Sequence, residues 1–283
     1  MVILSLNTQY NLYFGRFSLF IFFFFFFIFF ILFIYYIYVD FSSFFEVKNY
    51  ALYIEEDNSL LFVNSIFDIE KNDKYDGKVI TEVYSDIEGL VSFNSESVPW
   101  SNYSDEIKSV YVIDEIQPIS TAYWFYNFSN CNYLNLYNLD MSYVTELNYM
   151  FYNTGYDVEE LVIEGLSNWD TSNAIVMGHM FYNTGKNANV VDVGTLENWD
   201  VSDVLDMSYM FSYMALNSKQ FSLGNLSKWN TSNVTDMSYM FRKTGYEVKM
   251  KLDVSNWNVR NVTSYDGFNK YMKESILEPK WND

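Results

Sequence analysis

Short stretches of alternating apolar and polar residues recur about every thirty residues in the second half of the chain. Leu161 and Ile163 form one such stretch, and Val191 and Val193 form the next. An alternation with a period of two is typical of a strand that buries one face. We therefore expect a short strand in each unit, at residues 161–163, 191–193, 221–223 and 252–254.

A tryptophan follows each of these stretches. The four tryptophans are Trp169, Trp199, Trp229 and Trp257, and the first three are thirty residues apart. A Met-Phe pair comes eleven and twelve residues after each of these three, as Met180-Phe181, Met210-Phe211 and Met240-Phe241. Self-similarity at this period is the signature of stacked repeats, so we expect these ten side chains to form the core of the repeats.

The segment after each tryptophan has apolar residues at steps of three, as at Val234, Met237 and Met240. This spacing predicts a short helical or 3₁₀ turn. The sequence therefore predicts a repeat solenoid in which parallel short strands alternate with compact turns. Equivalent residues of neighbouring units would then lie about 5 Å apart.

Residues 17–39 are apolar or aromatic throughout, apart from Ser18. A helix of this length spans roughly 35 Å, enough to cross a hydrocarbon core of about 30 Å. Arg16 precedes the segment and acidic residues follow it, which favours a cytoplasmic N-terminus with residues 40–283 outside. We expect a signal-anchor that holds a single-pass protein at the cell surface through the lipid bilayer. The alternative is a cleaved signal segment and a secreted protein.

The segment between this span and the repeats is rich in strand patterns. ALYIEEDNSLLFV at 51–63 predicts a hairpin, and a terminal repeat needs a cap. The predicted organisation is a cytoplasmic N-terminus and transmembrane helix, a β-rich cap, a repeat solenoid and a C-terminal tail, at residues 1–39, 40–117, 118–272 and 273–283.

The composition changes this picture by what it excludes. The net charge of −19 disfavours nucleic acid as a partner. Cys131 is the single cysteine, so the chain forms no internal disulfide. His179, the single histidine, stands where other units have Ser or Asn, and we interpret it as an exposed substitution.

Catalytic motifs are missing from the sequence, and we predict no enzyme, no cofactor and no metal site. A calcium ladder is the alternative for Asp140, Asp170 and Asp200, which recur one residue after each tryptophan position. The same positions continue as Asn230 and Asn258, which favours turn formation instead.

The units NWDTSNAIVMGHMF, NWDVSDVLDMSYMF and KWNTSNVTDMSYMF resemble those of the BspA-type leucine-rich-repeat surface proteins. The resemblance covers roughly residues 50–270, including the region before the repeats. It implies a leucine-rich-repeat-like solenoid that is exported and has no catalytic activity. Some members of that family bind host matrix proteins.

We expect the outward residues of the strands to form a recognition surface for an extracellular protein or glycan, since they differ between units. These residues are Val162, Glu164, Asp192, Ser222 and Asp253. The alternative is a structural coat or spacer protein that assembles with copies of itself.

Overall fold

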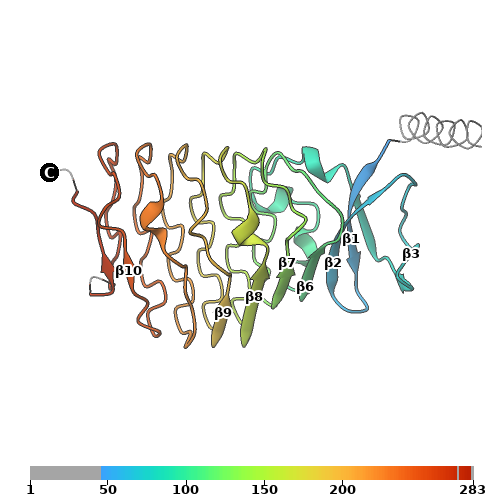
Figure 1. Cartoon of the computed structure of the whole chain (residues 1–283). Coiled ribbons are helices and arrows are strands. Elements are labelled where there is room, and N and C mark those ends of the chain that lie inside the picture. The colour runs from blue at the N-terminus through green and yellow to red at the C-terminus, as the bar shows by residue number, and fades with distance from the viewer. Residues whose placement is uncertain (1–45, 273, 282–283) are drawn as a thin grey trace, which may run out of the picture. The chain divides into compact units, whose positions relative to one another are not determined.

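Figure 1 shows the computed structural model of the chain, which describes residues 46–272 and 274–281. The chain divides into two compact units, Met1–Val47 and Lys48–Asp283. We describe the second unit, in which a hydrophobic core cluster runs from Ala51 to Ile276. The domain boundaries expected at residues 40, 118 and 273 stay predictions.

The largest element is a seven-stranded mixed sheet with the strand order β5-β1-β2-β6-β7-β8-β9. Its first three strands pair antiparallel and are β5 (Glu82–Ser85), β1 (Lys48–Ile54) and β2 (Ser59–Ser65). From β2 onward the pairing is parallel, through β6 (Ser109–Val112), β7 (Tyr133–Asn135), β8 (Glu160–Glu164) and β9 (Val190–Asp192). The sheet therefore changes from a hairpin arrangement to parallel strands at β6.

Two small pairs and several 3₁₀ turns complete the described elements. The antiparallel pair is β3 (Lys74–Tyr75) with β4 (Lys78–Val79), and the parallel pair is β10 (Leu252–Asp253) with β11 (Ile276–Leu277). The 3₁₀ turns have three residues each, at Ile87–Gly89, Ser95–Ser97, Ser101–Tyr103, Leu166–Asn168 and Leu226–Lys228. The described part of the chain contains no α-helix.

The predicted fold class, a leucine-rich-repeat-like solenoid of parallel strands and helical turns, is wrong. The structure is a mixed sheet of short strands that begins with antiparallel pairing, and residues 221–223 form no strand. The compact turn expected after Trp229 is not helical. Met237 N–H and Tyr239 N–H donate to Ser264 and Asp266 at 2.8 and 3.0 Å, so these groups pair with the next segment instead of closing a helical turn.

The predicted transmembrane helix, residues 17–39, lies outside the described residues. Within residues 46–272 and 274–281, no helix has the length and apolar character needed to cross a bilayer. The expectation of a single-pass membrane protein at the cell surface has no support in the structure, and we do not retain it.

Segments about thirty residues apart nevertheless lie side by side and pair in parallel (Figure 1). Single bridges join Glu146 to Val176, Val176 to Asp206, Asp206 to Asp236 and Asp236 to Ser264. This ladder places equivalent side chains of neighbouring segments over one another. The periodic spacing in the sequence therefore appears in the structure as columns of like residues.

Two aromatic columns fill the core of the periodic part. We call Trp169, Trp199, Trp229 and Trp257 the tryptophan column, in which successive ring centroids lie 5.9, 6.4 and 5.9 Å apart. Successive rings of the phenylalanine column lie 5.1 to 5.6 Å apart, at Phe125, Phe151, Phe181, Phe211 and Phe241. The predicted core methionines Met180, Met210 and Met240 are fully buried between the segments. Large aromatic side chains of this kind provide most of the buried apolar surface.

Further aromatic residues cover the first end of the phenylalanine column and the last end of both columns. At the first end, Phe62 of β2 packs on Trp100 and Trp124 with centroid distances of 5.3 and 5.4 Å. At the other end, Trp281 contacts Tyr265 and Phe268 at 4.4 and 5.0 Å. The C-terminal segment therefore closes the core, where the sequence predicted only a tail.

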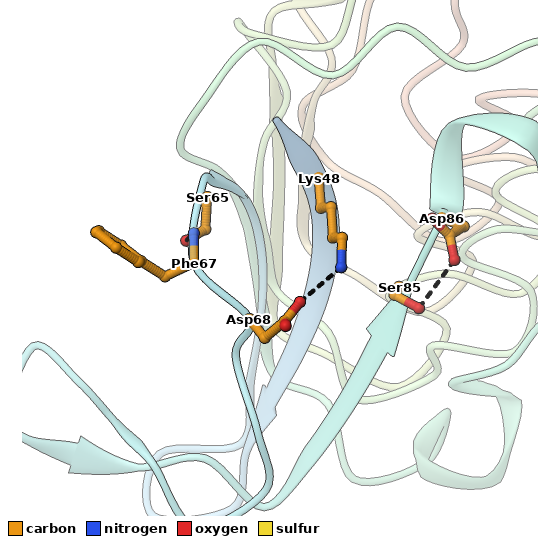
Figure 2. A network of polar contacts seen from close by, with 6 residues as sticks. All are labelled: Lys48, Ser65, Phe67, Asp68, Ser85 and Asp86. Atoms are coloured by element: carbon orange, nitrogen blue, oxygen red, sulfur yellow. Dashed lines mark hydrogen bonds and ion pairs between the residues drawn. The ribbon is translucent and has the colours of Figure 1, made fainter. Parts of the chain in front are cut away.

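The edge of the sheet near β1 carries polar contacts at its surface (Figure 2). The ammonium group of Lys48 lies 2.6 Å from Asp68, and Ser85 donates a hydrogen bond to Asp86 at 3.1 Å. Both carboxylates belong to loop residues that follow β2 and β5. Exposed ion pairs contribute little stability, about 0–1 kcal/mol, so this edge is held mainly by β1 and its strand partners.

Left-handed backbone corners recur in each segment on both sides of the Met-Phe position. In one segment the corner residues are Tyr149, Asn153 and Gly155, with φ of 61°, 57° and 61°. Glycine adopts this conformation without strain and asparagine tolerates it, which explains the repeated Tyr-Asn-Thr-Gly. Tyrosine at φ > 0 is unusual and is held there by its stacking neighbours.

Alanine substitutions at two glycines separate backbone strain from crowding. Gly185 and Gly194 have φ of 58° and 66°, but a Cβ at Gly185 would lie 2.4 Å from a Val191 methyl group, whereas a Cβ at Gly194 meets nothing within 4 Å. We expect Gly194→Ala to lower the free energy of unfolding by about 1–2 kcal/mol from strain alone. Gly185→Ala should cost roughly 1–3 kcal/mol more from overpacking. Urea denaturation measures both, and equal losses would contradict the packing described here.

Candidate functional site

The tryptophan column ends at Trp169, and a cavity of about 290 Å³ lies at that end. Leu139 stands thirty residues before Trp169, where the next segments have tryptophan. A leucine side chain fills less space than an indole, so Leu139 leaves room beside the ring of Trp169. The lining residues are Glu115, Tyr137, Asn138, Leu139, Asp140, Met141, Asn168, Trp169 and Asp170.

The indole N–H of Trp169 is buried and has no hydrogen-bond partner. The other indoles of the column donate to a leucine carbonyl of the preceding segment, from Trp199, Trp229 and Trp257 at 2.7, 3.0 and 2.9 Å. Trp169 is only 6 % exposed, so bulk water does not replace the missing bond. Buried polar groups in native proteins are nearly always paired, which makes this N–H a candidate contact for a ligand.

Carboxylates surround the same cavity. Burial raises the pKa of Asp140, but hydrogen bonds from Ser142 and Gln117 outweigh it and hold that pKa below its ordinary value. Asp170 accepts one hydrogen bond from Ser172 N–H at 3.0 Å, and Glu115 is exposed at the rim. The acidic groups therefore offer acceptors for ligand hydroxyl or amino groups.

The lining of the cavity contains apolar as well as polar residues. Leu139, Met141 and Trp169 are each less than 10 % exposed, whereas Asn138 and Asn168 lie at the exposed rim. An apolar wall with a few polar groups is the usual composition of a small-molecule site. The arrangement is suited to holding a ligand that has both apolar and hydrogen-bonding surface.

The five residues predicted to form a binding face lie elsewhere. Val162 and Glu164 are on β8, where Glu164 accepts a hydrogen bond from the Tyr133 hydroxyl at 2.6 Å. Val162 pairs in register with Asp192 of β9, so these two are neighbours. None of the five lines the cavity.

Three of these five residues have a local role in turns. Asp192, Ser222 and Asp253 accept hydrogen bonds from the backbone N–H two residues later, at 3.0, 3.1 and 3.0 Å. Hydrogen bonds from Ser255 lower the pKa of Asp253. Turn formation explains why polar residues recur at these positions.

The recurrent aspartates are also turn residues. Asp140, Asp170 and Asp200 each accept a hydrogen bond from the backbone N–H two residues on, at 2.9 to 3.0 Å. Across the part of the chain that the structure describes, no three His, Cys, Asp or Glu side chains converge on a possible metal position. A calcium ladder therefore finds no support among these residues.

Sequence reasoning missed the cavity although one signal for it was present. Leu139 interrupts the spacing of the tryptophans, and that interruption marks where the column ends. The unpaired indole N–H could not be predicted, because it depends on the path of the backbone around Leu136. The carbonyl of Leu136, which is 33 residues before Trp169, accepts a hydrogen bond from Leu139 N–H at 3.1 Å but none from the indole.

A protein family described as "Mycoplasma protein of unknown function, DUF285" matches the chain twice, over residues 119–215 and 183–274. Together the two matches cover more than half of the chain. The chain belongs to this family. Comparisons with curated proteins and with solved structures found no match.

The DUF285 match covers the periodic part of the chain, including the whole tryptophan column. The family is of unknown function, so the match assigns neither a ligand nor an activity. It provides no evidence for leucine-rich repeats, and that expectation is corrected. The resemblance to BspA-type surface proteins stays a prediction.

His179 of this DUF285 chain belongs to a surface column of stacked rings. Its imidazole lies 4.6 Å from the rings of both Tyr149 and Tyr209, and it shares their left-handed backbone, with φ of 61°. The side chain is half-buried, so its interpretation as an exposed substitution is wrong. Burial lowers the pKa of His179, although the charges of Asp206 and Asp236 oppose this shift.

The lowered pKa of His179 predicts a pH-dependent stability. As pH falls through the unfolded pKa of about 6.5, the unfolded chain takes up this proton before the folded chain does. The free energy of unfolding therefore falls over that window, until the folded form is also protonated. His179→Tyr keeps the ring column and removes this contribution. Urea denaturation at pH 8 and pH 5.5 should show a larger loss for the wild type than for His179→Tyr, and equal losses would contradict the burial of His179.

Proposed function

We propose that this DUF285 protein is a non-catalytic binding protein that holds a neutral or amino sugar unit of a glycan in the cavity beside Trp169. The unpaired, buried indole N–H of Trp169, one of the residues that line the cavity, is the observation that carries the proposal. A sugar oxygen would accept this hydrogen bond. The cavity would thereby complete the pairing that the next three indoles find within the protein.

The other lining groups support a sugar over an apolar ligand. The carboxylates of Glu115, Asp140 and Asp170 accept hydrogen bonds from hydroxyl groups, which a sugar ring presents on several sides. The apolar wall of Leu139 and Met141 packs against the C–H face of the ring. A ligand with donors, acceptors and an apolar face in one small unit fits this set of groups.

The charge and the size of the cavity narrow the class of sugar. The chain has a net charge of −19 and three acidic residues line the cavity, so an acidic sugar would be repelled there. At about 290 Å³, the cavity is at the small end of ligand pockets, which measure about 300–1,000 Å³. One ring at the end or side of a glycan fits better than an extended polymer.

The Leu139→Trp variant tests the site, because it introduces the residue that the following segments have at this position. The next segment has tryptophan at the equivalent position, so this variant should fold while its indole fills the cavity. In titration calorimetry with panels of neutral and amino-sugar oligosaccharides, we expect the full-length wild type to bind and Leu139→Trp to lose binding. Thermal unfolding of both proteins shows whether the fold is kept.

Two Glu→Gln variants, one in the cavity and one outside it, form a matched test. Glu115→Gln should weaken binding about tenfold or more, because hydrogen bonds to charged groups are worth about 1.5–3 kcal/mol. Glu160→Gln, on β8 and outside the cavity, should leave binding unchanged. Wild-type binding that survives Leu139→Trp would refute the site. Self-association without any glycan binding would favour the coat or spacer alternative.

A further inference from the structure

A second unusual site surrounds Tyr213, whose ring is contacted by three cations from the two neighbouring segments. Lys186 Nζ, Arg242 Cζ and Lys243 Nζ lie 5.3, 4.9 and 5.8 Å from the ring centroid of Tyr213. The three cationic residues are half-buried. The face of the aromatic ring attracts each cation, whereas the like charges of the three cations repel one another.

No carboxylate neutralises these cations within the part of the chain that the structure covers. The ion pairs found there involve Lys48, Lys71 and Lys78. The whole chain has 36 acidic and only 17 basic residues, so a basic cluster without an acidic partner is unexpected. The arrangement leaves a local concentration of positive charge on an acidic protein.

The cluster coincides with a break in a column of stacked tyrosines. Tyr126, Tyr152 and Tyr182 stack with centroid distances of 4.8 and 4.9 Å. The next two positions at this spacing are Ser212 and Arg242, and Tyr213 instead meets Tyr182 edge-on at 5.9 Å. A ring is therefore missing from the column directly before Tyr213.

Unpaired polar atoms accumulate at the same break. The Ser212 hydroxyl, Arg242 Nε and Asn183 Oδ1 are buried without a hydrogen-bond partner. Backbone hydrogen bonds place them on adjacent segments, from Asn183 N–H to Ser212 at 3.0 Å and from Tyr213 N–H to Arg242 at 2.8 Å. The break in the tyrosine column therefore leaves buried polar groups without hydrogen bonds.

We propose that Lys186, Arg242 and Lys243 bind a tetrahedral oxyanion, a phosphate or sulfate group, beside Tyr213. Such a group carries negative charge opposite to that of the three cations, and its several terminal oxygens can accept hydrogen bonds from their N–H groups. The site is separate from the sugar cavity, which none of these residues lines.

The net charge of the chain limits the size of the anion. A long polyanion would extend from the cluster over a surface whose total charge is −19 and would be repelled there. A single phosphate or sulfate group, free or attached to a small neutral carrier, avoids this repulsion. The chemistry is the same for a free ion and for a phosphorylated sugar, and the experiment distinguishes the two.

Titration calorimetry of the full-length chain at constant chloride concentration tests the site, first with inorganic phosphate and sulfate and then with glucose 6-phosphate. We expect saturable binding of the oxyanion and of glucose 6-phosphate, with the same affinities in Leu139→Trp, whose sugar cavity is filled and which should bind no glucose. Tighter binding of the sugar phosphate than of inorganic phosphate would identify a carrier-linked group as the ligand. Equal or weaker binding would identify the free ion.

Matched variants connect the binding to the cluster. Arg242→Gln and Lys186→Gln should each weaken binding tenfold or more, and Lys219→Gln, an exposed lysine outside the cluster, should leave it unchanged. Because Arg242 is half-buried, thermal unfolding of each variant is measured alongside, and Lys186→Gln repeats the test at a second position. The proposal is overturned if the wild type binds no oxyanion, or if Lys219→Gln loses as much affinity as the cluster variants.

Discussion

The hydrogen bond from three successive buried indoles to a leucine carbonyl of the preceding segment is the constraint on which the periodic part depends. Trp199 and Trp229 each reach a carbonyl 33 residues back, and Trp257 reaches one 31 residues back. An indole N–H buried without a partner costs free energy, so each tryptophan needs a preceding segment with the same backbone path. The rings also stack with centroids 5.9 to 6.4 Å apart, and the dispersion energy and buried apolar surface of this stacking stabilise the same arrangement. Segments of nearly equal length follow from this requirement.

Both candidate sites lie where a column of like residues is interrupted. The tryptophan column stops because Leu139 stands before Trp169, and the cavity and the unpaired N–H of Trp169 are found at that end. The tyrosine column is interrupted at Ser212, beside the three cations around Tyr213. Where a residue repeats, its packing and hydrogen-bonding partners come from the neighbouring segments. Where the repeat is interrupted, some groups lack these partners, and a ligand could supply them. Departures from a local rule are the places where function is expected.

The sequence located the periodic core residues but not the conformation between them. The thirty-residue spacing of Trp169 and Trp199 could be seen directly, and the structure stacks both rings. The turn after Trp229 was expected to be helical, because apolar residues at steps of three suit a 3₁₀ turn. A tight turn with a left-handed corner at Tyr239 places the same residues inward. Because tyrosine rarely adopts a positive φ, the sequence does not predict this corner. The candidate site could be predicted only in part, because Leu139 shows where the tryptophan column is interrupted but not that the indole N–H of Trp169 is unpaired.

Hydrogen exchange of the indole N–H groups, followed by NMR and assigned with single Trp→Phe variants, tests the central claim most directly. The account predicts slow exchange for Trp199, Trp229 and Trp257, whose N–H groups are paired and buried. It predicts much faster exchange for Trp169, whose N–H group has no hydrogen-bond partner. Equal protection of Trp169 and the other three, or rapid exchange of all four, would contradict it.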